Sequence, residues 1–243
     1  MQSKTEAGLK ILGFIENSFI DWDGMITSII FLPGCNFRCP FCHNHELVSG
    51  WEKLEDKKVD PSHVLEMLSD NAQWIDGLTV TGGEPLLQMG ALVPFLKKVK
   101  KTGVKVKLDT NGSDPSSLRK LIDMKLVDYI AMDVKAKLED SAYSKAAGVD
   151  VNLVRIKESI KLIISSGVDY EFRTTVVPGL VSGSDVLDIA KELKGCMLYA
   201  LHKFHSENAW SEFCRKTKPY SDDEMKAMEK SASKYVPVKL RLR

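Results

Sequence analysis

The chain has 243 residues, of which 44% are hydrophobic and 28% charged, so it can bury a large core beneath a charged surface. Its 34 basic and 33 acidic side chains leave a formal net charge of +1, which provides no overall attraction for nucleic acid or an anionic membrane. No apolar run approaches the roughly 20 residues of a membrane-spanning helix, and residues 1–6 are polar, unlike a signal peptide. We expect a single cytoplasmic domain over residues 1–243.

Hydrophobic runs with strand character alternate with helical segments along the chain. Asp60 and Asp114 each precede a proline, which is typical of helix starts, and glycines follow several helical segments. Such alternation predicts right-handed βαβ crossovers and a parallel sheet. The expected fold class is therefore α/β, a partial (β/α)6 TIM-type barrel with its active site at the strand C-terminal ends. The six predicted strands cover residues 25–32, 77–81, 104–108, 127–132, 170–177 and 196–201.

The C-terminal part of the sequence predicts one more helix and one more strand. The helix covers residues 221–234 with Ser221 as its cap, and the strand covers residues 236–241 near a sheet edge. Cys196 begins an apolar run, which predicts a buried thiol. Cys214 lies in a Lys/Arg-rich connection, which predicts an exposed one.

Cys35, Cys39 and Cys42 follow the first predicted strand with the spacing C-x3-C-x2-C. Five cysteines, three of them clustered, suit a reducing compartment better than a disulfide framework. Three thiolates on one loop leave a tetrahedral site incomplete, and metal sites with an open position are usually catalytic. A structural zinc site completed by His43 or His45 would explain the same spacing, so this loop alone leaves both open.

Unusual polar residues follow the other strands at their C-terminal ends. Residues 81–85 (Thr-Gly-Gly-Glu-Pro) follow the second strand, residues 109–112 (Asp-Thr-Asn-Gly) the third, and residues 133–135 (Asp-Val-Lys) the fourth. The fifth strand contains Arg173, and the sixth leads to His205. In a parallel α/β barrel these strand ends meet on one face, where such enzymes place their active sites. We therefore expect one pocket.

Two of these motifs also have ordinary explanations. Gly82 and Gly83 are compatible with a plain turn, although paired glycines also admit a ligand close to the backbone, where Glu84 would receive an ammonium group. Asp109 and Asp133 suit solvated strand ends, or a hard-cation site together with hydroxyl and carbonyl oxygens.

The basic residues are ambiguous in the same way. Lys135 and Arg173 suit surface charges, but Arg173 interrupts an apolar strand and needs a partner if it points inward. His205, taken alone, suggests a satisfied surface histidine.

Taken together, the motifs resemble the radical S-adenosylmethionine superfamily, and specifically the activating enzymes of glycyl radical enzymes. The three-cysteine spacing with its His43-Asn44 extension, the Gly-Gly-Glu-Pro motif, Asp-Thr-Asn-Gly and Asp-x-Lys occur in the order expected for that group. Residues 10–21 and 218–243 are similar to the branch that activates anaerobic ribonucleoside-triphosphate reductase.

The resemblance implies one [4Fe-4S] cluster on Cys35, Cys39 and Cys42, with the fourth iron chelated by S-adenosylmethionine. It also implies a monovalent-cation site formed by Asp109, Thr110 and Asp133. No second cysteine cluster lies between residues 44 and 77, so no auxiliary-cluster domain is expected. The residues implied to contact the cofactor are Phe41, His43, Gly83, Glu84, Asp133, Lys135, Arg173 and His205.

The implied reaction is reductive cleavage of S-adenosylmethionine to methionine and a 5'-deoxyadenosyl radical. In the resembling enzymes that radical takes a hydrogen atom from one glycine of a partner protein. The expected partners are a glycyl radical enzyme, in this branch anaerobic ribonucleotide reductase, and reduced flavodoxin or ferredoxin as electron donor. Neither a membrane nor nucleic acid is expected as a partner.

Two alternatives stay open at this point. One is a radical S-adenosylmethionine enzyme of another branch, which modifies a small molecule, a nucleic acid or another protein. The other is a zinc-stabilised binding module without catalysis. By the same resemblance, residues 14–23 are the candidate segment for lining the opening that receives the partner loop.

Overall fold

The computed structural model describes residues 8–242, so the polar residues 1–6 lie outside the described part. Its strands form one open, eight-stranded sheet in which the order β1 to β8 follows the chain. The first pair is antiparallel, whereas β2–β3, β3–β4, β6–β7 and β7–β8 are parallel. This mostly parallel sheet with intervening helices confirms the predicted α/β class.

The chain folds into two compact units, each assembled from separate segments. Among the described residues, the first contains residues 8–36, 46–110 and 116–129, and the second contains residues 37–45, 111–115 and 130–242. The organisation as a single domain stays a prediction. Among the described residues, no helix is both long and apolar enough to cross a membrane.

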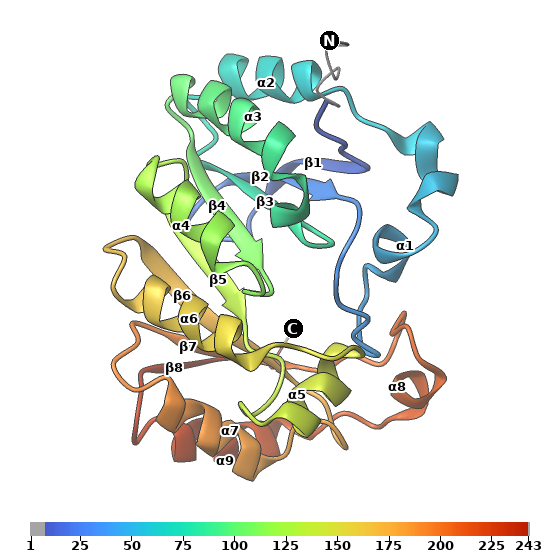
Figure 1. Cartoon of the computed structure of the whole chain (residues 1–243), viewed down its shortest axis with the longest axis vertical. Helices are drawn as coiled ribbons and strands as arrows, with labels where there is room; N and C mark the ends of the chain where they lie inside the picture. The colour runs from blue at the N-terminus through green and yellow to red at the C-terminus, as the bar shows by residue number, and fades with distance from the viewer. Residues whose placement is uncertain (1–7, 243) are drawn as a thin grey trace. The chain divides into compact units, whose positions relative to one another are not determined.

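The first unit contains the strands β1 to β4. Leu78 and Val80 of β3 and Val106 and Leu108 of β4 are fully buried, and the alternating Thr79 and Lys107 are almost fully buried as well, so both faces of these strands are covered. Asp60 caps α2 by accepting a hydrogen bond from the Ser62 amide over 2.8 Å. Figure 1 shows α2 and α3 together at one end of this unit. Its elements, apart from the first residues of α1 and α4, which belong to the second unit, are β1 (Gly13–Ser18), β2 (Thr27–Leu32), β3 (Gly77–Gly82), β4 (Lys105–Thr110), α1 (His45–Val48), η1 (Trp51–Lys57), α2 (Pro61–Asp70), η2 (Pro85–Gln88), α3 (Met89–Lys101) and α4 (Pro115–Asp123).

The strand β1 and the turn that follows it were not predicted as ordered elements. The Lys107 ammonium, almost fully buried, donates to the carbonyl oxygen of Asp21. The Trp22 ring lies against Gly77, where an added Cβ would be 2.7 Å from the ring. Phe19, in contrast, is 72% exposed. The candidate partner-facing segment, residues 14–23, is therefore anchored at Asp21 and Trp22, while its role stays a prediction.

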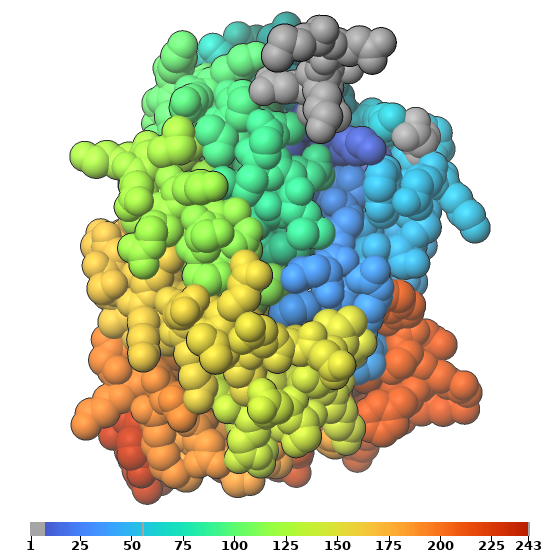
Figure 2. Space-filling view, in the orientation of Figure 1, coloured from blue at the N-terminus to red at the C-terminus, as the bar shows by residue number. Residues whose placement is uncertain are grey.

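The second unit contains most of β5 and the strands β6 to β8. Ser221 caps α9 as predicted, in a capping box with Glu224. The helices α7 and α9 pack against each other, and α9 also packs on β7 and β8 (Figure 1). On the face turned toward the viewer in Figure 2, side chains of α6 and α7 form much of the surface of this unit. Its elements are β5 (Tyr129–Asp133), α5 (Asp140–Ala147), α6 (Leu153–Ile164), β6 (Asp169–Val176), α7 (Gly183–Glu192), β7 (Tyr199–Lys203), α8 (Glu212–Lys216), α9 (Asp222–Ala232) and β8 (Val238–Arg241).

The prediction of an exposed Cys214 is wrong. Its side chain is fully buried, because the short helix α8 turns it inward while Phe213 and Arg215 face solvent. Cys196 is 4% exposed, as predicted for a core residue.

Candidate active site

The cysteine loop begins directly after β2. Cys35 belongs to the first unit, and Cys39 and Cys42 to the second. Within the described chain, none of the five cysteines is in a disulfide. Burial raises the pKa of the Cys39 thiol to about 11, and the nearby Lys135 charge offsets part of that rise. The Cys39 thiol therefore suits a metal that displaces its proton and supplies positive charge.

In the first unit, Glu84 is a buried carboxylate with a fixed orientation. It is 1% exposed, and its Oε1 accepts hydrogen bonds from the Thr110 hydroxyl over 2.9 Å and from the Leu86 amide over 3.2 Å. Thr110 ends β4 and Glu84 follows β3, so two strand ends meet here as predicted. An oriented carboxylate of this kind is suited to receive an ammonium group.

Gly83 lies against the start of the cysteine loop. This contact explains why position 83 requires a glycine, and it could not be predicted from the sequence. A Cβ at this position would lie 1.9 Å from the carbonyl oxygen of Gly34. The amide of Glu84 donates to the same oxygen over 2.7 Å, and the amide of Gly83 donates to Leu32 O over 2.8 Å. The glycine thus admits the backbone that precedes Cys35, whereas close approach by a ligand stays a prediction.

Asp109 faces a cation within the first unit. Its carboxylate lies 3.8 Å from the Lys107 ammonium. Thr110, a neighbour in the predicted cation site, directs its hydroxyl hydrogen to Glu84. The monovalent-cation site stays a prediction.

In the second unit, Asp133, Lys135 and Arg173 form a network at the end of β5. Arg173 Nε donates to Asp133 Oδ1 over 2.8 Å, and Lys135 Nζ donates to Asp133 Oδ2 over 2.9 Å. Burial opposes ionisation of Asp133, but the two cations outweigh it and hold the pKa of its carboxyl well below the usual range. The Lys135 ammonium also lies 5.9 Å from the centre of the Phe41 ring. The inward partner that Arg173 requires is therefore Asp133.

His43 and His205 are neighbours in the second unit. His43 Nε2 lies 2.9 Å from the carbonyl oxygen of His205. Within the described residues the buried Nε2 of His205 has no hydrogen-bond partner, so the reading of His205 as a satisfied surface histidine is wrong. A buried ring nitrogen in this state needs water or a ligand. It therefore fits a residue that contacts a cofactor.

The sequence missed a second polar network in this unit. Glu171, 1% exposed at its side chain, pairs with Arg241 through two hydrogen bonds of 3.0 and 2.7 Å. Arg241 also lies 3.2 Å from His202 Nε2. The available signal was the presence of a glutamate and a histidine at the apolar runs of two adjacent strands. Arg241, the partner of Glu171, lies 70 residues away in the sequence, so the pair could not be recognised from local pattern.

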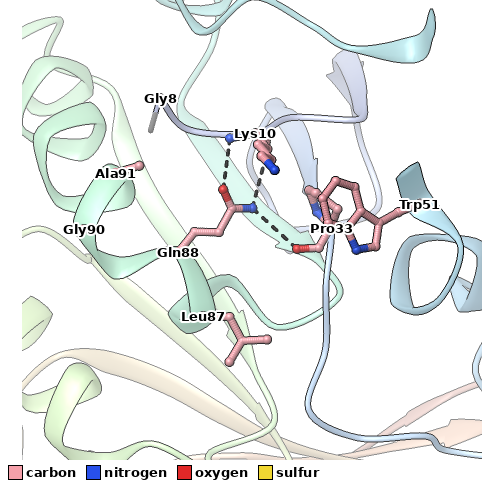
Figure 3. Close-up of a pocket in the computed structure, with 8 residues that line it drawn as sticks. All are labelled: Gly8, Lys10, Pro33, Trp51, Leu87, Gln88, Gly90 and Ala91. Carbon is pink, nitrogen blue, oxygen red and sulfur yellow. Dashed lines mark hydrogen bonds between the residues drawn. The ribbon is translucent and has the colours of Figure 1, made fainter. Parts of the chain in front are cut away.

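A pocket of about 310 Å³ lies in the first unit (Figure 3). The Lys10 ammonium is 4.5 Å from the centre of the Trp51 ring at its rim. Gln88 spans it, accepting from the Lys10 amide over 2.9 Å and donating to Lys10 O over 3.2 Å and Pro33 O over 3.4 Å (Figure 3). None of the predicted cofactor residues is among the described residues that line it.

Comparisons with known proteins identify the relatives of the chain. Residues 29–193 match the model of the Radical SAM superfamily. The "Putative glycyl-radical enzyme activating enzyme MJ1227" of Methanocaldococcus jannaschii is 34% identical over 93% of this chain and 92% of its own length. The "Pyruvate formate-lyase-activating enzyme" of Clostridium pasteurianum is 25% identical over 74% of this chain and 76% of its own length.

Solved structures share the fold at low sequence identity. The crystal structure of Streptococcus suis SuiB superposes with a TM-score of 0.65 at 13% identity, covering 88% of this chain and 50% of SuiB. That of QueE from Escherichia coli gives a TM-score of 0.55 at 15% identity, covering 97% of this chain and 94% of QueE. The superfamily match covers more than half of the sequence, and the M. jannaschii relative aligns over nearly all of both chains. The chain therefore belongs to the radical S-adenosylmethionine superfamily, within the family of glycyl-radical enzyme activating enzymes.

Proposed function

We propose that this chain uses S-adenosylmethionine, held at a [4Fe-4S] cluster on Cys35, Cys39 and Cys42, to install a glycyl radical on a partner enzyme. The observation that carries the proposal is the 34% identity, over nearly all of both chains, to the relative named "Putative glycyl-radical enzyme activating enzyme MJ1227". Superfamily membership implies the cluster and S-adenosylmethionine. When bound, they supply the one-electron cleavage of the carbon–sulfur bond.

The chain's own residues bind and orient the cofactor. Glu84, fixed by Thr110, accepts hydrogen bonds from the methionine ammonium at a water-poor position. Gly83 lies beside it. Because Glu84 is oriented before the cofactor arrives, little ordering is needed on binding.

The second unit supplies cations and a ring nitrogen. Arg173 and Lys135 share Asp133 and are held in place by it, so a cofactor carboxylate or ribose oxygen meets cations that are already oriented. Phe41 gives an apolar side, and His43 orders the backbone at His205, whose Nε2 is available for the cofactor.

The partner we favour is anaerobic ribonucleoside-triphosphate reductase, on the similarity of residues 10–21 and 218–243 to that branch. A second candidate is a pyruvate formate-lyase type of partner, because several relatives carry that name. Reduced flavodoxin or ferredoxin is the proposed electron donor. A cytoplasmic, reducing location is part of the proposal, since the loop cysteines have to stay out of disulfides.

The deciding experiment adds S-adenosylmethionine and a reductant to the anaerobically reconstituted protein in the presence of each co-expressed glycyl radical enzyme. We expect an electron paramagnetic resonance signal of a glycyl radical with one partner and no signal with the Cys39→Ala protein. Cleavage of S-adenosylmethionine without a glycyl signal on any partner would contradict the proposal. Deuterium transfer from a small molecule or nucleic acid into 5'-deoxyadenosine would then identify another branch.

A further inference from the structure

We infer that Gly148 is a positioning residue for the cysteine loop. It lets the C-terminal end of α5 hold the backbone at Arg38, so that Cys39 stands where it binds the cluster. The inference rests on the proposed function, because it takes the cluster to be bound by this loop.

Gly148 ends α5 in the left-handed conformation, with φ of 69° and its amide donating to Ser144 O over 2.8 Å. An added Cβ would lie 2.0 Å from the carbonyl oxygen of Arg38 and 2.6 Å from its carbonyl carbon. Real Cβ atoms essentially never come within 3.0 Å of such neighbours. Any side chain at position 148 would therefore displace the backbone that immediately precedes Cys39.

A hydrogen bond to α5 also holds the backbone of Arg38 in place. The amide of Arg38 donates to the carbonyl oxygen of Ala147 over 2.7 Å. The last carbonyls of a helix lack partners within the helix, so the loop supplies a donor that α5 needs. The Arg38 side chain is not required for this contact, because it is exposed and bonds to the adjacent Phe37 O.

The helix that presents Gly148 is itself immobilised by burial. Tyr143, Ala146 and Ala147 of α5 are fully buried. The helix therefore gives way little to a side chain added at position 148.

The loop is also held at its opposite side. The amide of Ser211 donates to Pro40 O over 2.8 Å, while the Ser211 hydroxyl caps α8. In Figure 1 the blue segment around residues 37–45 accordingly lies between the ends of α5 and α8. With Arg38 and Pro40 both fixed at the backbone, Cys39 is placed before any metal binds, which is the arrangement that supports a precise metal site.

The chain contains a matched control for Gly148. Gly167 has φ of 73°, yet an added Cβ there would meet nothing within 4 Å. Alanine at position 167 therefore introduces the same backbone strain without a collision.

The experiment compares the full-length wild type, Gly148→Ala and Gly167→Ala after anaerobic reconstitution with iron and sulfide. Bound iron under chelator competition, the resonance spectrum of the reduced cluster and the melting curve are measured for each. We expect Gly148→Ala to bind iron at least about tenfold more weakly, the usual effect of losing a supporting contact at a metal site, with an altered spectrum. Gly167→Ala should match the wild type in iron affinity and in the spectrum of the reduced cluster. Wild-type iron affinity in Gly148→Ala, or an equal loss in both variants, would overturn the inference.

A second pair decides the question if Gly148→Ala does not fold. Arg38→Pro removes the amide hydrogen that is donated to the carbonyl oxygen of Ala147, whereas Arg38→Ala keeps this hydrogen bond. Iron binding should weaken only in Arg38→Pro, and equal binding by the two would count against the inference. A wild type that binds no iron would refute the proposed function itself, which separates the two failures.

Discussion

Arg173 and Asp133 are joined by a hydrogen bond of 2.8 Å, which neutralises a cation in the middle of β6 with a carboxylate at the end of β5. Lys135 shares the same carboxylate. Replacing Asp133 with Asn should leave two partly buried cations without their anion and cost roughly 2 kcal/mol of unfolding free energy. Urea unfolding measures this loss. The control is Asp188→Asn, which breaks an exposed pair with Lys191 and should change stability by less than about 0.5 kcal/mol.

The Asp133 network also predicts a pH dependence. Because the folded pKa of Asp133 is depressed, its contribution is complete above the ordinary carboxyl pKa of about 4 and declines only as the pH falls toward the folded value. The stability difference between wild type and Asp133→Asn should therefore be constant from about pH 7 to 5 and shrink below about pH 4. A difference that already disappears near pH 6 would show that Asp133 is not ionised in this network.

Glu84 allows charge to be separated from hydrogen bonding. Glu84→Gln keeps an oxygen acceptor for Thr110 and Leu86 but removes the negative charge. It should retain the cluster and bind S-adenosylmethionine roughly tenfold or more weakly, since hydrogen bonds to charged groups contribute about 1.5–3 kcal/mol. Calorimetric titration and iron content report the two properties. Loss of iron in this variant would mean that Glu84 supports the cluster rather than the cofactor.

The raised pKa of Cys39 should make cluster loading sensitive to pH. With a pKa of about 11, the thiol is protonated near neutrality, and metal binding has to release its proton. Loading of the cofactor-free protein, followed by visible absorbance, should accelerate markedly between about pH 7 and 9. A rate that is independent of pH over this range would contradict deprotonation of a buried thiol as the limiting requirement.

Breaking the Glu171–Arg241 pair should destabilise the fold strongly, and replacing both residues with apolar ones should restore much of the stability. Glu171→Gln should cost about 3 kcal/mol, because it leaves a largely buried guanidinium without its carboxylate. The double change Glu171→Leu with Arg241→Met should recover much of that loss, since an apolar replacement removes both desolvated charges. Chemical denaturation of the wild type, the Glu171→Gln variant and the double variant tests this. Equal instability of the single and double variants would contradict the prediction.

The features predicted from sequence were those with local signals. Ser221 and Asp60 were identified as helix caps because capping depends on residues a few positions away. The strand-end motifs were identified because chemically unusual residues follow apolar runs. Cys214 was misplaced because its basic neighbours suggested a surface, whereas the phase of α8 turns it inward.

What the sequence could not reveal depends on contacts between distant residues. Gly148 looks like an ordinary helix-ending glycine, and only the folded chain brings Arg38 against it. Gly83 likewise belongs to a recognisable motif, but its contact with Gly34 O is visible only in the structure. The orphaned nitrogen of His205 depends on burial, which a single histidine in a polar stretch does not indicate.

The ring of Trp210 stacks on His45, with centres 6.0 Å apart and an angle of 20° between the planes. His45 stands three residues beyond Cys42, so this indole is a fluorophore beside the cluster loop. Iron–sulfur chromophores absorb where tryptophan emits, and occupied protein should therefore be dimmer than empty protein. A variant that retains Trp210 as its sole tryptophan would report cluster assembly and loss optically, in real time and without a partner enzyme.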